Sequence, residues 1–255
     1  MSIGLLAASP PWPVLLAGAA MVFVAGTLRG YTGFGFSIAA VPLLGLVGTP
    51  ATIVPIVLML QLAVSANGLR PAARQGDWRS IRLLAGGALL ATPVGLWALT
   101  ELPDVVVRLA IACTVSAAVL VLGLGFRPAT APSGLRVLLF GLASGLFNGV
   151  AGMPGPPAIA YYLGAPIPGA MARASMIVLF TLTSIFALVP LLALGRLDAE
   201  TCSLAAAALP IVWWGSSLGA WLHARSSERM YRDSSLAVLA ATAVLATAKA
   251  LSFFL

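Results

Sequence analysis

Long apolar stretches alternate with short polar or charged breaks along almost the whole chain. Because a bilayer leaves no water to satisfy an open strand edge, all these stretches are predicted to be helical. At roughly 20 residues per crossing, the chain has room for about ten spanning or partly spanning segments. We expect them at residues 14–28, 34–47, 51–69, 83–99 and 105–124, and again at 135–150, 156–163, 171–194, 204–222 and 235–254.

Composition excludes an ordinary soluble fold. Of the 255 residues, 60% are apolar and 8% are charged, whereas about a quarter of a soluble domain is charged. The 14 basic and 7 acidic residues form no long basic run, so the excess indicates positive loops on the inner side of a membrane rather than a nucleic-acid surface. The expected surroundings are a lipid bilayer. Cys113 and Cys202 are interpreted as packed free thiols.

The amino terminus is expected to be retained. No Lys or Arg precedes Arg29, and Pro10, Pro11 and Pro13 open the first apolar run. The charged start of a cleavable signal peptide is therefore missing.

Two sets of residues recur at fixed distances, which predicts a duplicated unit. We divide the chain into a first repeat at 1–126, a linker at 127–134 and a second repeat at 135–255, together forming one membrane domain. Gly26, Gly30 and Gly33 recur 119 residues later as Gly145, Gly149 and Gly152, and Gly95, Trp97, Asp104 and Arg108 recur 124 residues later as Gly219, Trp221, Glu228 and Arg232.

The charges of the loops predict that the two repeats are inverted. Residues 70–82 hold four arginines and one aspartate, which favours the cytoplasmic side, while the matching stretch 195–200 holds one arginine and two acids. The next loop, with Glu101 and Asp104, is acidic, whereas its counterpart holds three arginines against Glu228, so the charge bias again changes sides. Each repeat must then cross an odd number of times, so we predict a hairpin of short or re-entrant helices followed by three transmembrane helices.

Both hairpins contain a break rich in glycine or proline. The first reads Arg29-Gly30-Tyr31-Thr32-Gly33-Phe34-Gly35-Phe36-Ser37, and the second reads Asn148-Gly149-Val150-Ala151-Gly152-Met153-Pro154-Gly155. Such backbone is predicted to be non-helical, and at membrane depth it is tolerated only where it is buried or lines a cavity. Helix ends there direct N–H groups inward and favour an anion. For Gly30 and Gly149, close helix packing is an equal alternative.

Arg29 is the strongest candidate for binding an anion. It adjoins the break and follows an apolar run, where an arginine is costly unless it is paired or faces water. The alternative is a guanidinium that snorkels to the interface. Asn148 is its neutral counterpart, and Arg173 is interpreted as a loop charge. Tyr161 could donate to a substrate or mark the interface. The predicted substrate-binding residues are Arg29, Gly30, Thr32, Gly33, Gly35, Ser37, Gln61, Asn148, Gly149, Gly152, Gly155 and Tyr161.

Several kinds of chemistry lack their residues. Every acidic residue falls in or beside a predicted loop, which disfavours a pump that uses a carboxylate within the membrane. No cluster of metal ligands and no phosphate-binding loop G-x-x-x-x-G-K-[ST] occurs. We therefore expect no metal, no cofactor and no enzymatic activity.

Together these features resemble the TauE/SafE family of sulfite exporter-like membrane permeases. The resemblance rests on the glycine-rich element and its copy, on Gly76-Asp77-Trp78-Arg79, and on the loops with Asp104-x-x-x-Arg108 and Glu228-x-x-x-Arg232. The chain departs from the family at Phe34-Gly35-Phe36 and Met153-Pro154-Gly155-Pro156, where glycine runs are common. The resemblance implies outward secondary transport of small sulfur-containing or organic anions, such as sulfite or sulfonates, across a bacterial inner membrane.

The expected mechanism places the anion between the two hairpin tips near the midplane, where tip N–H groups and Arg29 hold it while the halves rock. The anion then moves either with its own proton or down its gradient and the membrane potential. An anion channel and a membrane subunit that only scaffolds a partner are the alternatives. The oligomeric state is left open.

Overall fold

The computed structural model describes residues 11–66, 68–123 and 134–225, and every regular element in these ranges is a helix. The predicted all-helical fold is confirmed for this part of the chain, and the expected segment 235–254 lies outside it. In chain order the helices are α1 (Trp12–Thr32), α2 (Phe36–Leu44), α3 (Pro50–Ala66), α4 (Leu69–Gln75), α5 (Trp78–Glu101), α6 (Asp104–Gly123), α7 (Gly134–Ala151), α8 (Gly155–Gly164), α9 (Gly169–Ala193) and α10 (Ala199–His223).

Five of these helices are long and apolar enough to cross a membrane: α1, α5, α7, α9 and α10. Their outer faces carry large apolar side chains that water would not favour, including Leu90 on α5, Val189 on α9, and Trp214 on α10, whose exposed fraction is 77%. Cys113 and Cys202 are free thiols as predicted, but both are exposed rather than packed. Exposed apolar faces on long helices are those of a membrane protein.

The two hairpins differ from the prediction in the lengths of their helices. The first members, α1 and α7, have 21 and 18 residues, whereas the second members, α2 and α8, have 9 and 10. At 1.5 Å per residue, α2 and α8 reach only about 15 Å, half of a hydrocarbon core of roughly 30 Å. The break in each hairpin therefore separates a full-length helix from a half-length helix.

The basic stretch 70–82 is mostly helical, which corrects its interpretation as a loop. Arg70 and Arg74 lie on α4, and Arg79 and Arg82 lie on the first turns of α5. The expected segment 51–69 ends early because α4 turns away from α3 by 71°. Asp77 begins α5 by accepting a hydrogen bond from the Arg79 N–H at 3.2 Å, the usual role of an aspartate at this position.

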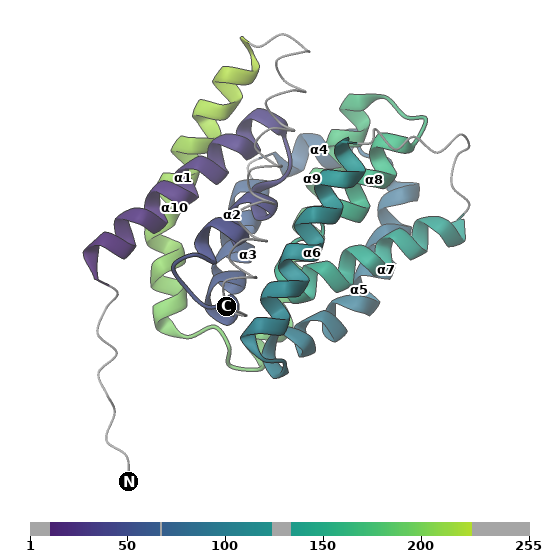
Figure 1. Cartoon of the computed structure of the whole chain (residues 1–255). Coiled ribbons are helices and arrows are strands. Elements are labelled where there is room, and N and C mark those ends of the chain that lie inside the picture. The colour runs from purple at the N-terminus through teal and green to yellow at the C-terminus, as the bar shows by residue number, and fades with distance from the viewer. Residues whose placement is uncertain (1–10, 67, 124–133, 226–255) are drawn as a thin grey trace.

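Helices from the two halves of the chain are paired across the molecule. Figure 1 shows α1 beside α10 on one side and α5 beside α7 on the other, with α2, α3 and α9 between them. Glycines bring the paired backbones close together. A glycine of α1 and its counterpart 119 residues later on α7 meet residues of α10 and α5 that are themselves 124 residues apart. Gly26 meets Val212 as Gly145 meets Ala88, and Gly30 meets Ser216 and Ala220 as Gly149 meets Thr92 and Leu96.

The buried core lies between these outer pairs. Most of its largest fully buried side chains come from α2, α3, α8 and α9, for example Ile38, Leu58, Ile159 and Leu179, and α5 adds Ile81 and Leu84. Arg108 of α6 donates to the carbonyls of Gly45 and Gly48 at 2.8 and 2.9 Å, which fixes the carboxyl end of α2. The half-length helices are thus held at the centre, with their amino-terminal ends at the two breaks.

Candidate anion site at the two helix breaks

The first break is present where the glycines predict it, but it is shorter than the predicted stretch 29–37, because only residues 33–35 lie outside α1 and α2. α1 ends at Thr32, and the Gly33 N–H donates to the Arg29 carbonyl at 2.7 Å. Gly33 and Gly35 have φ values of 82° and 86°, a left-handed conformation that costs other residues roughly 1–2 kcal/mol. The Thr32 hydroxyl closes the turn through bonds with the backbone of Leu28 and Phe34. Thr32 therefore shapes the break.

The second break repeats this arrangement between α7 and α8. The Gly152 N–H donates to the Asn148 carbonyl at 2.8 Å, and Gly152 has a φ of 62°. Gly155 is the first residue of α8, and the Ser144 hydroxyl donates to the carbonyl of Pro154 just before it. Backbone on both sides of each break is buried, as membrane-depth irregular backbone must be.

Arg29 lies at the end of α1 with only 7% of its surface exposed. One of its terminal nitrogens donates to the Ser65 hydroxyl of α3 at 3.3 Å. Within the ranges that the structure describes, no carboxylate pairs with this guanidinium. A snorkelling side chain would keep its charge in water, so the burial favours the interior position over the alternative.

Arg173 belongs to α9 and not to a loop, which corrects its interpretation. A Cβ atom on Gly33 would lie 2.5 Å from Nε of Arg173, so the arginine side chain covers the first break. The Arg29 carbonyl accepts the Gly33 N–H one turn before the break, Arg173 lies against Gly33 itself, and the described carboxylates pair with neither arginine. The break therefore carries two uncompensated positive charges. Arg173 falls inside the expected helical segment 171–194, and the 119-residue offset aligns it with Val54 inside the third apolar segment, so both sequence signals agree with its helical position.

Buried polar side chains link α3, α9 and α7 beyond Arg29. Gln61 donates to the Ser184 hydroxyl at 3.3 Å, and the Asn148 amide donates to the Thr183 carbonyl at 2.8 Å. Ser65 and Ser184 are 119 residues apart and both are fully buried. These contacts bring Arg29, Gln61 and Asn148 into one polar row through the centre of the protein.

Other predicted residues lie elsewhere or have a structural role. Gly30 faces α10 and Gly149 faces α5, each against backbone atoms, so close packing accounts for glycine at both positions. Ser37 lies buried in the first turn of α2, near the first break. Tyr161 packs edge-on against Tyr162, with ring centroids 5.0 Å apart, beside the α4–α5 corner rather than at either break.

The fold and the site define a class: a helical membrane protein with paired breaks and a buried arginine beside the first of them. A family model described as Sulfite exporter TauE/SafE matches residues 18–246, and the chain belongs to this family of membrane transporters. A protein of Cupriavidus necator named "Probable sulfite/organosulfonate exporter TauE" is 30% identical over 212 residues, which cover 80% of this chain and 82% of that protein. No solved structure matches the chain.

Proposed function

We propose that this protein is a secondary transporter that exports small sulfur-containing or organic anions, such as sulfite or sulfonates, across a bacterial inner membrane. The observation that carries the proposal is Arg29, a buried guanidinium beside a helix break with one hydrogen bond, to Ser65, and no carboxylate partner among the described residues. A buried charge without a counter-ion is costly. An anionic substrate supplies that counter-ion.

The kinship with an exporter supports the proposed direction and chemical class. The Cupriavidus necator protein is named for sulfite and organosulfonates, and both are small oxyanions that a guanidinium binds well. We place the substrate near the midplane, close to Arg29, Gly33, Gly35 and Ser37 of the first break, with Gly152 and Gly155 of the second break opposite. Gln61 and Asn148 continue the polar row from this position.

The transport cycle rests on two inverted repeats, 1–126 and 135–255. The residue-by-residue match of the α1–α10 contact with the α5–α7 contact supports this division. In each contact, a helix of one repeat packs on a helix of the other. Rocking of one repeat against the other would therefore open the site alternately to the two sides.

The positions of the acidic residues support a cycle in which the protein itself carries no proton. Asp77, Glu101, Asp104, Asp198 and Glu200 all stand at or next to the ends of helices. No carboxylate of the described spans is then placed to carry a proton across. The anion moves with a proton of its own, or down its gradient and the potential, which drives an anion outward with roughly 2.3 kcal/mol per charge per 100 mV.

Binding of sulfite to purified Arg29→Gln protein tests the proposal. We expect the affinity to fall by about tenfold or more, because a hydrogen bond to a charged group is worth about 1.5–3 kcal/mol. Arg196→Gln removes the same charge from an exposed loop position and should bind sulfite as the wild type does. Thermal unfolding with and without sulfite provides a second readout, since a ligand that binds only the folded state stabilises it.

Transport by the same proteins in vesicles decides between a carrier and a channel. A carrier shows saturation and counterflow of labelled sulfite, whereas a channel shows neither. Unchanged affinity in the Arg29→Gln protein would remove Arg29 from the site, and flux without saturation would reject alternating access.

A further inference from the structure

The two breaks occupy matching positions but are covered by different side chains. Gly33 and Gly152 lie 119 residues apart. A Cβ atom on Gly33 would meet Nε of Arg173 at 2.5 Å, whereas a Cβ atom on Gly152 would meet Cγ1 of Val54 at 3.3 Å. Arg173 and Val54 are also 119 residues apart. A cation therefore covers the first break at the position where an apolar side chain covers the second.

The counterpart of Arg29 in the second break offers no free donor. The Nδ2 donor of Asn148 is directed at the Thr183 carbonyl, 2.8 Å away, with Thr92 Oγ1 at 3.5 Å. Its Oδ1 atom is buried and has no hydrogen-bond partner among the described residues. An acceptor oxygen repels an anion. The second break thus lacks both the charge and the side-chain donor that the first break has.

The backbone donors differ in the same direction. The first N–H groups of a helix have no partner within it, and no side chain caps α2 or α8. α2 begins with Phe36, Ser37 and Ile38, each of which has an N–H group. α8 begins with Gly155-Pro156-Pro157, and proline has no N–H to donate. The amino-terminal end of α8 is therefore a poor anion ligand.

We infer that the anion is bound by the first break alone, between Arg29 and Arg173, and that this site prefers a doubly charged oxyanion to a singly charged one. This inference rests on the proposed function and assigns Arg173 as the second cationic ligand. The second break closes the pathway with apolar and neutral groups instead of sharing the charge.

The preference for two charges follows from the charge balance. Arg29 and Arg173 supply two positive charges, and no carboxylate of the described residues pairs with either. A dianion neutralises both, whereas a monoanion leaves one excess positive charge beside a buried guanidinium. Because charges interact strongly around the buried Arg29 guanidinium, the second negative charge is expected to strengthen binding by about tenfold or more.

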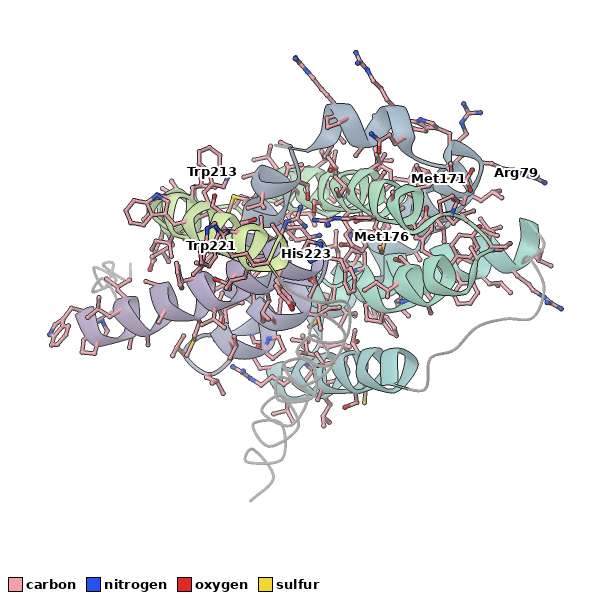
Figure 2. All side chains as sticks on the ribbon, turned by 90° about the horizontal axis from the view of Figure 1, so that it is seen from above. Arg79, Met171, Met176, Trp213, Trp221 and His223 are labelled. Atoms are coloured by element: carbon pink, nitrogen blue, oxygen red, sulfur yellow. The ribbon has the colours of Figure 1, made fainter. Side chains whose placement is uncertain are left out.

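Arg173 also marks the side from which the anion enters. It is exposed, whereas Arg29 is buried. Two residues further along α9, the Ser175 hydroxyl accepts a hydrogen bond from the Asp77 N–H at 2.8 Å, at the corner that carries the basic residues of α4 and α5. Figure 2 shows Met171, at the start of α9, near Arg79 on this side. The basic stretch is predicted to be cytoplasmic, so the anion meets Arg173 before Arg29.

The test compares sulfite with methanesulfonate, which share a three-oxygen face. At an alkaline pH at which sulfite carries two charges, methanesulfonate carries one. All measurements share this pH, so the two anions meet the protein under the same conditions. Affinities are measured by calorimetry for the wild type, Arg173→Gln, Arg196→Gln, and Val54→Thr, a near-isosteric change at the position that matches Arg173.

We expect the wild type to bind sulfite about tenfold or more tightly than methanesulfonate, and Arg173→Gln to bring the two affinities within about threefold. Val54→Thr and Arg196→Gln should retain the wild-type ratio. Equal affinities in the wild type, or an unchanged ratio in Arg173→Gln, would overturn the inference while leaving the proposed function standing. Failure of both anions to bind the wild type would overturn the proposed function itself.

Discussion

The side chain of Arg173 covers Gly33, with Nε 2.5 Å from the place that a Cβ atom would take. Two separate constraints therefore require glycine at this position. The backbone has a φ of 82°, which a side chain disfavours, and the space beside the Cα atom is filled by a guanidinium group. The first constraint forms the break, and the second gives the break its charge.

Gly33→Ala is expected to weaken sulfite binding by displacing Arg173. The flexible arginine side chain can move aside, so the protein should still fold, at a cost of roughly 1–2 kcal/mol for the left-handed conformation. Gly35→Ala is the matched control, because Gly35 has a φ of 86° but its nearest neighbour, Oγ1 of Thr32, would lie 4.0 Å from the new Cβ atom. Thermal unfolding and sulfite titration of both variants separate strain from displacement.

Similar losses of stability in the two variants, with a clearly larger loss of affinity in Gly33→Ala, are the expected result. Equal losses of affinity would mean that strain in the break, and not the position of Arg173, controls binding.

The breaks could be predicted from sequence because their causes are local. Gly33, Gly35 and Gly152 adopt positive φ values, and glycine next to further glycine or proline indicates such backbone directly. The end of α1 was harder to predict. The apolar pattern stops at Leu28, yet the helix continues to Thr32, and Gly30 in this last turn packs against the backbone of α10. Sequence alone does not show that contact.

The role of Arg173 depends on a contact between distant parts of the chain. Its neighbours in sequence suggest a loop, since Pro166 and Pro168 precede it. In the structure α9 begins at Gly169 and brings Arg173 onto the first break. The basic stretch 70–82 differs from its predicted loop for a related reason. Charged residues at the ends of helices resemble a loop in sequence, and the packing of α4 on α9 joins parts of the chain that are far apart.

Gly30→Ala is expected to lower the stability of the protein whether or not an anion is bound. A Cβ atom there would overlap the Ser216 carbonyl of α10, and backbone cannot move aside cheaply, so the cost should be about 1–3 kcal/mol. Gly86→Ala on α5 is the control, since nothing lies within 4 Å of its new Cβ atom; it should be neutral or stabilise the helix by up to about 1 kcal/mol.

Thermal unfolding in detergent, followed by tryptophan fluorescence, measures both variants. If Gly30→Ala were as stable as the wild type but failed to bind sulfite, Gly30 would be a ligand-binding position and not a packing position.

The dependence of transport on voltage reports the charge that crosses with each substrate molecule. If the first break carries sulfite as a dianion without a proton, an inside-negative potential drives it outward with two charges. A tenfold gradient at equilibrium then corresponds to roughly 30 mV, against roughly 60 mV for methanesulfonate with one charge. Proteoliposomes held at potassium diffusion potentials, at one alkaline pH on both sides, give this voltage per tenfold gradient for each anion. An equal value near roughly 60 mV for both anions would show that sulfite crosses with one net charge, accompanied by a proton. The two arginines would then not select the dianion for transport.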